Sequence, residues 1–392
     1  MVRDRPYRIF ISTGEVSGDL QGGLLVQALQ RRAEALGLPL EIPALGGDRM
    51  AAAGATLVGN TMGLGSVGLV ESLSFVVPSW QVHQRAKAYL RRHPPDLVIL
   101  IDYMGPNLSL GRFVRRYLPG VPLVYYIAPQ EWVWTWGKSN TSAIAQIPQE
   151  ILAIFPDEAH YYEKQGARVT WVGHPLLDRL DTYPDRATAR AHLGLDPHTP
   201  LVALLPASRF QELTYLLPVL CQAAQRIQAA IPQVQFYIPL SQAAFQEPLQ
   251  RAIADYGLQA QVWPGDSQWV MAAADVALTK SGTVNLELAL QNIPQVVIYR
   301  LSPITAWIAR HVLRFSIPFA APPNLVLHRA AVPELLQDAA TGEAIATAAL
   351  DLLTNSQRRG QMLADYQELR SALGAPGVCD RVAAHLLAYL QT

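Results

Sequence analysis

The sequence predicts an α/β protein built from two doubly wound, Rossmann-like parallel sheets that face a cleft. Short apolar runs alternate with longer amphipathic stretches, which is the pattern of repeated β-α units. The runs lack polar alternation, as expected of parallel strands that are buried on both faces. The 392 residues exceed the ~100–200 residues of a typical single domain, so we expect two domains.

The expected strands fall into two series separated by a linker region at Asp178–Pro200. The first series is Arg8–Ser12, Leu97–Asp102, Leu123–Ile127, Ile151–Phe155 and Val169–Val172, with helices at Leu20–Leu36 and Val77–Arg92. The second is Leu201–Leu205, Gln235–Pro239, Ala260–Trp263, Val276–Lys280 and Gln295–Tyr299, with helices at Leu213–Ala230 and Ser267–Ala274. We therefore expect an N-terminal domain over 1–180, a C-terminal domain over 181–340, and a helical segment over 341–392 that packs on the first domain or on a partner subunit.

Composition excludes several classes of protein. Half of the residues are hydrophobic and the mean hydropathy is +0.13, which is incompatible with a disordered chain. Thirty-one basic residues balance thirty-one acidic ones, so no global field attracts nucleic acid. Two cysteines cannot form a disulfide framework. No apolar run approaches the ~20 residues of a membrane span, and the N-terminus lacks a signal peptide, so we expect a cytoplasmic protein.

Carboxylates follow two strands of the first domain. Glu15 and Asp19 stand in a glycine-containing loop that opens a helix, where they suit sugar hydroxyls or general-base work; alternatively, Ser17 or Asp19 simply caps the helix. Asp102 ends a strong apolar run, a position that suits a base for an acceptor hydroxyl or a residue that caps the next turn.

Aromatic and histidine residues of the first domain have two interpretations each. Trp132, Trp134 and Trp136 share one face if the segment is extended, and would stack on a sugar or line an acyl groove, or pack in the core. His174 follows a strand and is either a ligand contact or a hydrogen-bonded structural histidine.

The second domain carries groups suited to a diphosphate. Ser208 and Arg209 follow its first strand, and an arginine beside backbone amides is a phosphate-binding arrangement. Ser281, Gly282 and Thr283 lead into a helix, where hydroxyls and amides would bind phosphate oxygens. Glu287 lies one turn further on the same face and would accept hydrogen bonds from ribose hydroxyls.

In order along residues 8–340, these motifs resemble the lipid-A-disaccharide synthase family, which are inverting, metal-independent glycosyltransferases of the GT-B type. The motifs that carry the resemblance are Gly14–Asp19, Gly47–Met50, Gly68–Glu71, Trp132–Trp134, Phe155–Glu158, Val172–Leu176, Leu205–Arg209, Ser281–Thr283 with Glu287, Pro323–Leu325 and Val332–Gln337.

The resemblance implies a reaction and roles for residues. UDP-2,3-diacylglucosamine would donate its sugar to the 6-hydroxyl of 2,3-diacylglucosamine 1-phosphate, giving a β-1,6-linked disaccharide 1-phosphate and UDP, with no metal and no cofactor. The catalytic residues would be Asp102, Arg209, Glu15 and Asp19. The UDP-sugar would be held by Ser208, Arg209, Ser281, Gly282, Thr283, Glu287, Asn324, Glu334 and Gln337, and the acceptor or acyl side by Glu71, Asn107, Trp132, Trp134 and His174.

The sequence departs from the family pattern at four places. Gly105 replaces the second Asp of Asp-x-Pro-Asp-Phe-Asn, and Thr135 stands where an Arg follows the tryptophans. These two changes lie on the acceptor side and point to an altered acceptor or acylation. Ala207 for Gly and Val284-Asn285 for Ala-Thr are mild and leave the UDP side intact.

Two apolar stretches are candidates for contact with a bilayer, at Leu64–Val77 and Pro303–Phe319. They would make the protein peripheral on the inner face of the cytoplasmic membrane; alternatively they pack in the core or at a dimer interface, and the resemblance implies a homodimer. Two other functions stay open: another UDP-sugar enzyme of the same type, a transferase or a 2-epimerase, and a non-catalytic UDP-sugar or lipid-binding protein.

Overall fold

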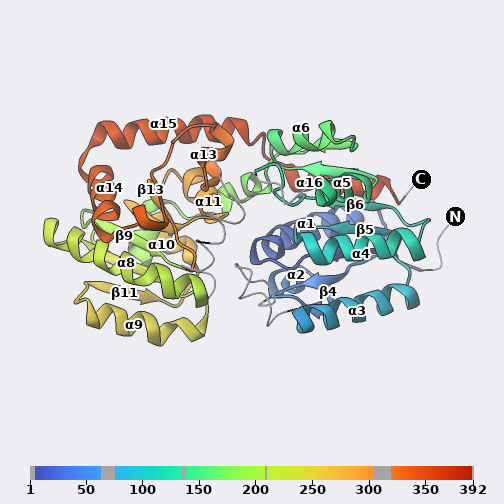
Figure 1. The fold of residues 1–392 in the computed structure, drawn as a ribbon, viewed down its shortest axis with the longest axis horizontal. Coiled ribbons are helices and arrows are strands. Elements are labelled where there is room, and N and C mark those ends of the chain that lie inside the picture. The colour runs from blue at the N-terminus through green and yellow to red at the C-terminus, as the bar shows by residue number, and fades with distance from the viewer. Residues whose placement is uncertain are drawn as a thin grey trace. The chain divides into compact units, whose positions relative to one another are not determined.

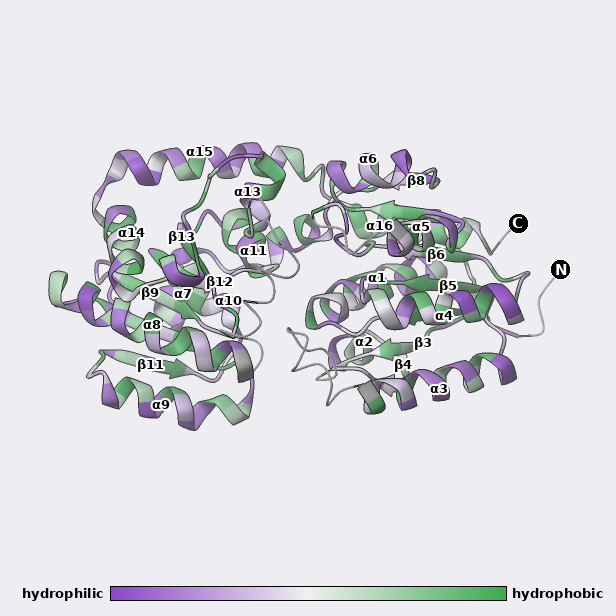
Figure 2. Ribbon diagram, viewed as in Figure 1, coloured by the Kyte–Doolittle hydropathy of each residue, from purple (hydrophilic) through white to green (hydrophobic). Residues whose placement is uncertain are grey.

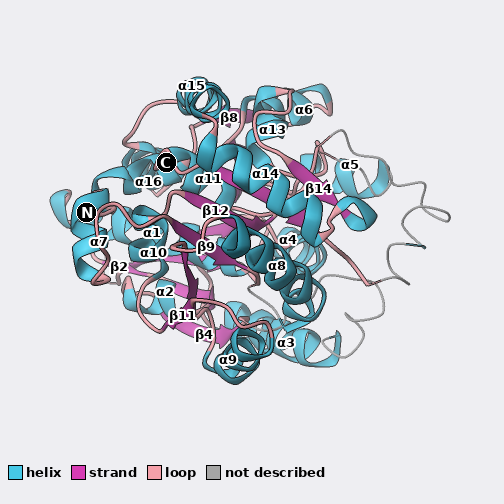
Figure 3. Ribbon diagram, turned by 90° about the vertical axis from the view of Figure 1, so that its left-hand side faces the viewer, coloured by secondary structure: helices cyan, strands magenta, loops and turns pink. Residues whose placement is uncertain are grey.

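The computed structural model describes residues 5–62, 76–133, 138–207, 210–302, 307 and 319–390 (Figure 1). The chain forms two compact units. Unit 1 comprises residues 1–178 and 373–392, and unit 2 comprises residues 179–372. The predicted boundary at residue 180 therefore lies within two residues of the observed one. Helices flank the strands of each sheet (Figure 3).

Unit 1 is built on a parallel sheet of eight strands in the order β4-β3-β1-β5-β6-β7-β8, with β2 paired to β1. The strands are β1 (Tyr7–Ser12), β2 (Leu40–Glu41), β3 (Pro43–Gly46), β4 (Thr56–Asn60), β5 (Leu97–Leu100), β6 (Leu123–Tyr126), β7 (Glu150–Ala153) and β8 (Val169–Trp171). The helices are α1 (Val16–Ala35), α2 (Asp48–Ala52), α3 (Val76–Arg92), α4 (Met104–Tyr117), α5 (Lys138–Gln146), α6 (Pro156–Lys164) and α16 (Val378–Ala388).

Unit 2 is built on a parallel sheet of six strands in the order β11-β10-β9-β12-β13-β14. The strands are β9 (Leu201–Leu205), β10 (Gln235–Pro239), β11 (Ala260–Trp263), β12 (Val276–Lys280), β13 (Gln295–Tyr299) and β14 (Glu334–Leu336). The helices are α7 (Arg186–His192), α8 (Phe210–Ala230), α9 (Gln246–Asp255), α10 (Ser267–Ala273), α11 (Val284–Leu290), α13 (Pro322–Leu327), α14 (Gly342–Thr354) and α15 (Ser356–Ala372). Short 3₁₀ turns stand at Pro175–Thr182, Ala243–Phe245 and Gln337–Ala339.

Burial explains why the central strands read as continuous apolar runs. All residues of β5 and β6 are fully buried, and four of the five residues of β9 are buried. The central strands are accordingly hydrophobic in Figure 2, while the outer helix faces are polar. Each unit has its own core, around Phe10, Leu100 and Tyr125 in unit 1 and around Leu201, Met271 and Leu288 in unit 2.

The ten predicted strands are confirmed, and the structure differs from the prediction at the C-terminal segment. Residues 341–372 form α14 and α15, which belong to unit 2. The polar groups of α15 explain this placement, because the Tyr366 hydroxyl contacts the Gln295 amide of β13 at 3.2 Å and Asp365 pairs with Arg329. Residues 373–392, with α16, are the part that packs on unit 1.

Asp178 anchors α16 to the rest of unit 1. Its carboxylate accepts hydrogen bonds from the backbone N–H groups of Gly377, Val378 and Cys379, at 2.6, 3.0 and 2.7 Å. These donors lie at the first turn of α16, where a helix has no internal acceptors. Within the described ranges, no helix is both long and apolar enough to cross a membrane.

Candidate active site

Both sheets have a strand pair at which the order of strands reverses. In unit 1 the chain runs outward from β1 and β5 in opposite directions, and in unit 2 it does so from β9 and β12. Ligands of open α/β sheets bind beyond the carboxyl ends of such a pair. Glu15 follows β1 and Asp102 follows β5, whereas Ser281 and Thr283 follow β12. The predicted residues therefore stand at the binding edge of each sheet.

The backbone at Asp102 is held in a left-handed conformation. The φ angles of Asp102 and Tyr103 are 44° and 54°, which costs free energy in residues with a side chain. The Asn107 amide offsets this cost by donating to the carbonyls of Asp102 at 2.8 Å, Ile101 at 3.1 Å and Ser12 at 3.2 Å. The Tyr125 hydroxyl donates to the Asp102 carbonyl at 2.9 Å. The strained loop is thus fastened to both β1 and the sheet.

Asn107 was predicted to face the acceptor, and the structure places it in the interior instead. It is fully buried, and its Oδ1 accepts from the Ser12 hydroxyl at 2.7 Å. Each polar atom of its side chain is therefore used within the protein. Asn107 positions the loop that carries Asp102, and we do not retain it as an acceptor contact.

The Asp102 carboxyl is a weak acid in this setting. Desolvation is the main cause and the nearby charge of Glu15 is the second, and together they raise the pKa of Asp102 to about 7. A carboxyl with a pKa near neutrality suits proton transfer at physiological pH. Glu15 stands at the N-cap position of α1 and is half-buried.

Tyr103 closes the space between the loops after β1 and β5. A Cβ at Gly14 would lie 2.2 Å from Cε1 of the tyrosine ring, so only glycine fits there. The Tyr103 hydroxyl shares a hydrogen bond of 3.1 Å with Ser79 of α3. The buried ring of His83 lies 5.8 Å from the Tyr103 ring, and burial lowers its pKa to about 4. His83 is therefore neutral at physiological pH.

Asp19 has a structural environment. Its carboxylate is buried and accepts from the backbone N–H groups of Gly47 at 2.7 Å, Arg49 at 3.1 Å and Met50 at 3.2 Å. These groups belong to the loop after β3 and the first turn of α2. Asp19 therefore caps α2 rather than its own helix, which corrects the predicted local cap.

The rings of His174 and Trp132 both contact the ring of Phe155, which lies just after β7. The centroid of the Phe155 ring lies 5.1 Å from that of His174 and 5.5 Å from that of Trp132. His174 is buried, its Nδ1 accepts from the Leu176 N–H at 3.2 Å, and burial lowers its pKa to about 3. It is thus a neutral, hydrogen-bonded histidine, the structural alternative of the sequence analysis. Trp132 is half-buried and its Nε1 has no hydrogen-bond partner in the described structure, and its predicted contact with the acceptor stays a prediction.

Several predicted residues lie outside the described residues. These are Glu71 and Trp134 on the acceptor side, with Trp136 beside them, and Ser208 and Arg209 on the UDP side. Their predicted roles stay predictions.

The loop after β12 carries the hydroxyl groups of Ser281 and Thr283, and the two differ in their hydrogen bonds. The Ser281 hydroxyl donates to the Ala320 carbonyl at 2.7 Å, so its proton is used within unit 2. Thr283 is the N-cap of α11, is half-buried, and its side chain makes no capping bond. The Gly282 N–H donates to Asn285 Oδ1 at 2.8 Å, which shapes the turn. Thr283 is therefore the group of this loop best placed to donate to a phosphate.

Asn285, where the family pattern has Thr, is part of a buried network. Its amide donates to the Lys280 carbonyl at 3.1 Å and to Gln295 Oε1 at 3.0 Å. The Gln295 amide returns a bond of 2.9 Å to the Asn285 carbonyl. The departure from the pattern is thus matched by a polar partner on β13.

Glu287 lies on α11 one turn beyond Thr283. Its Oε2 accepts from the Tyr183 hydroxyl at 3.1 Å and from Arg179 Nη1 at 3.3 Å. The Arg179 guanidinium also lies over the Tyr183 ring, 5.2 Å from its centroid. Arg179 and Tyr183 were not among the predicted site residues, although their place in the linker directly after the first domain was a signal for them.

Asn324 and Glu334 are hydrogen-bonded to each other. Glu334 accepts from the backbone N–H groups of Ala320 and Ala321, both at 2.8 Å, and from the Asn324 amide at 2.7 Å. Asn324 also bonds both backbone groups of Val332. Gln337, with φ of 48°, accepts from the Leu301 N–H at 3.3 Å. These side chains shape the loops around β14, and their predicted contact with UDP-sugar stays a prediction.

No group of three or more potential metal-ligating side chains gathers anywhere in the described ranges.

The fold defines a class of protein, the α/β proteins with two parallel-sheet units of the GT-B type. UDP-GlcNAc 2-epimerase from Neisseria meningitidis, solved bound to UDP-GlcNAc, is similar with a TM-score of 0.69 at 10% identity, covering 98% of this chain and 100% of that chain. A glycosyltransferase from Rickettsia africae has a TM-score of 0.55 at 10% identity, with 99% of each chain covered. These likenesses confirm the GT-B fold.

The sequence comparisons are more specific. The family model of lipid-A-disaccharide synthetase matches residues 9–388. A lipid-A-disaccharide synthase of Gloeothece citriformis is 54% identical, covering 98% of this chain and 100% of the relative, and that of Geobacter sulfurreducens is 35% identical, covering 100% and 99%. The chain belongs to the lipid-A-disaccharide synthase family of UDP-sugar glycosyltransferases.

Proposed function

We propose that this family member transfers 2,3-diacylglucosamine from its UDP derivative to the 6-hydroxyl of 2,3-diacylglucosamine 1-phosphate, with inversion, in lipid A biosynthesis. The observation that carries the proposal is the placement of Asp102 and Glu15 at the reversal point of one sheet and of Thr283 and Glu287 at that of the other. Acceptor activation and UDP binding would thus be divided between the two units.

In the proposed mechanism, Asp102 removes the proton of the acceptor hydroxyl. Its raised pKa keeps the carboxylate basic enough to do so, and the fastened loop holds it in one conformation. The hydroxyl oxygen attacks the anomeric carbon of the donor from the face opposite UDP, which leaves with the electron pair of the broken bond.

The departing diphosphate needs positive charge and hydrogen-bond donors. Arg209 would supply the charge and Thr283 a hydroxyl, while Glu287, held by Tyr183 and Arg179, would accept bonds from the ribose. The proposal requires neither a metal nor a cofactor, because these groups serve the leaving diphosphate.

Gly105 stands where the family pattern has a second aspartate. A Cβ at Gly105 would meet no atom within 4 Å, so the space for the family's second carboxylate remains open. We propose that the change at this position goes with an altered acceptor or acylation.

We also propose peripheral contact with a membrane surface. Val77 and Trp80, one turn apart on α3, are each 60% exposed and adjoin the predicted apolar stretch at 64–77, of which residues 64–75 lie outside the described residues. Trp307, within the other stretch, is 58% exposed. An exposed tryptophan beside aliphatic residues suits the interfacial region of a bilayer. The homodimer implied by the resemblance stays a prediction.

UDP release from UDP-2,3-diacylglucosamine, measured with and without the acceptor, tests the function. The proposal expects release that depends on the acceptor and is lost in Arg209→Gln. Acceptor-independent UDP release with formation of a 2-epimer or glycal would identify a 2-epimerase instead. Binding of the UDP-sugar without turnover would identify a binding protein.

A further inference from the structure

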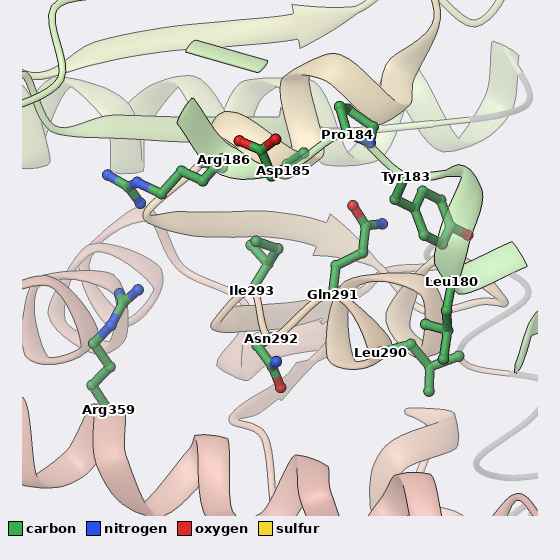
Figure 4. Close-up of a pocket in the computed structure, with 12 residues that line it drawn as sticks. Leu180, Tyr183, Pro184, Asp185, Arg186, Leu290, Gln291, Asn292, Ile293 and Arg359 are labelled. Carbon is green, nitrogen blue, oxygen red and sulfur yellow. The ribbon is translucent and has the colours of Figure 1, made fainter. Parts of the chain in front are cut away.

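Unit 2 holds a pocket of about 290 Å³ that is separate from the loops described above (Figure 4). It lies at the amino-terminal ends of β12 and β13, because Ala274 lies two residues before β12 and Ile293 lies two residues before β13. The loops that carry Thr283 and Ser281 leave the opposite ends of these parallel strands. Its volume is at the lower end of the ~300–1,000 Å³ found for ligand sites.

One side of the pocket is cationic. Arg186 from α7 and Arg359 from α15 both line it. Arg186 contacts the Asp275 carboxylate at 2.8 Å, and Arg359 donates to the Asp275 carbonyl at 2.8 Å, so the two guanidiniums meet around one residue. Each guanidinium has five N–H donors, and these contacts leave several of them for a ligand.

The acidic groups around the pocket do not cancel this charge. Arg190 also pairs with Asp275, at 3.5 Å, so two guanidiniums share that carboxylate while Arg359 contacts the carbonyl of the same residue. Asp185 is the one carboxylate among the lining residues, and its oxygens accept from the N–H and hydroxyl of Thr188 at 2.9 and 2.7 Å. The pocket therefore favours an anion at the arginine side.

The other side of the pocket offers hydrogen bonds for hydroxyl groups. Gln291 lines it, and its Oε1 is buried without a hydrogen-bond partner in the described structure. A buried acceptor without a donor is rare in native proteins and marks a place where a ligand or water donates. The apolar side chain of Ile293 lies between the arginines and Gln291, and that of Leu180 lies beyond Gln291, near Leu290.

We propose that this pocket binds a small hydroxylated organic phosphate, of the size of a hexose monophosphate. The phosphate would lie between Arg186 and Arg359, whose planar guanidiniums match phosphate oxygens, and a hydroxyl would donate to Gln291 Oε1. Two arginines and an unpaired amide oxygen at opposite sides of one cavity favour this class over an inorganic ion, which would leave the amide unpaired.

The ligand would also reach the UDP side, a step that rests on the proposed role of Glu287. Tyr183 and Gln291 line the pocket, and both bond Glu287: the tyrosine through its hydroxyl at 3.1 Å and the glutamine through Nε2 to the carbonyl at 3.2 Å. Filling the pocket holds these two side chains in place and preorganises Glu287. UDP would therefore bind more tightly to protein that already holds the pocket ligand. By the same coupling, the pocket ligand would bind more tightly to protein that already holds UDP.

Isothermal titration of the full chain with glucose 6-phosphate, with and without saturating UDP, tests both steps. The proposal expects binding in both conditions and a Kd about fivefold lower with UDP. Arg359→Gln and Arg186→Gln would each raise the Kd about tenfold or more. Arg226→Gln, which changes an exposed arginine of α8, would leave it unchanged.

Five results would overturn the proposal or part of it. Absence of glucose 6-phosphate binding up to about 10 mM, or equal Kd values for Arg186→Gln and Arg226→Gln, would remove the site. Loss of binding in saturating UDP would place the ligand in the donor site instead. Inorganic phosphate binding as tightly as glucose 6-phosphate would remove the hydroxyl contact at Gln291. An unchanged Kd with UDP would disprove the coupling, whereas a failed transfer reaction would leave the measured binding intact.

Discussion

The side chain of Asp102 stands at the end of β5 on a backbone with two consecutive positive φ angles. Strain of this kind persists where surrounding bonds enforce it, and here Asn107 and Tyr125 do so. The strand and its terminal carboxylate could be predicted from the apolar run before it. The strain and the role of Asn107 could not, because they depend on contacts between β1 and the loop after β5.

The pKa of Asp102 predicts how the rate depends on pH. A base must be ionised, so kcat/KM should rise with pH through about 7, where Asp102 loses its proton. Glu15→Gln removes the neighbouring negative charge and should move this limb to lower pH. Asp102→Asn should lower kcat/KM by about 10²-fold or more. A limb that stays in place in Glu15→Gln would contradict this assignment.

The raised pKa of Asp102 also predicts how the stability of the folded protein depends on pH. The folded-state pKa of Asp102 lies above the ~3.9 of an unfolded aspartate, so folding favours the protonated form. The stability it contributes is present below about pH 4 and is lost as pH rises through about 7. Asp102→Asn should therefore raise the melting temperature at pH 8 more than at pH 4, measured by thermal denaturation. An equal change at both pH values would show that the ionised carboxylate carries no such cost.

At the scale of elements, burial explains only part of which strands were predicted, because the buried β3 was missed and the partly exposed edge strands β8 and β11 were predicted. The central strands are buried on both faces and give unbroken apolar runs, whereas the edge strands β4 and β14 are partly exposed along their length and give none. The α14 and α15 segments were expected to leave the second domain. Their position depends on polar contacts such as that of Tyr366 with Gln295, which no local pattern reveals.

The attachment of α16 through Asp178 is testable by substitution. Asp178→Ala would leave three N–H groups at the start of the helix without their acceptor, and should lower the free energy of unfolding by about 1–3 kcal/mol. It should also expose Cys379, a buried cysteine of α16, to a thiol reagent. Denaturant titration and labelling kinetics measure the two effects.

The matched control is Asp181→Ala, which removes an exposed aspartate from the same 3₁₀ turn. It should change neither stability nor labelling, and the buried Cys221 of unit 2 should stay unreactive in both variants. Equal labelling of Cys379 in Asp178→Ala and the unchanged protein would show that α16 does not depend on this cap.

At the scale of the whole molecule, each unit repeats one design. A parallel sheet reverses its strand order beside its first strand, and the chemistry-bearing loops follow the two strands at that point. The sequence predicted the two sheets and placed Glu15, Asp102, Thr283 and Glu287 after the correct strands. It did not show that Asp19 caps α2 or that Asn107 is interior, since each bonds groups far from it along the chain. For His174 the sequence left two alternatives, and the structure shows the hydrogen-bonded histidine.

The central claim is that this chain joins two acylated glucosamines. Its most direct test is mass spectrometry of the products after incubation with UDP-2,3-diacylglucosamine and 2,3-diacylglucosamine 1-phosphate. The account predicts a tetraacyl disaccharide 1-phosphate together with UDP, and little of it from Asp102→Asn. Unchanged monosaccharide acceptor after complete consumption of the donor would contradict the account.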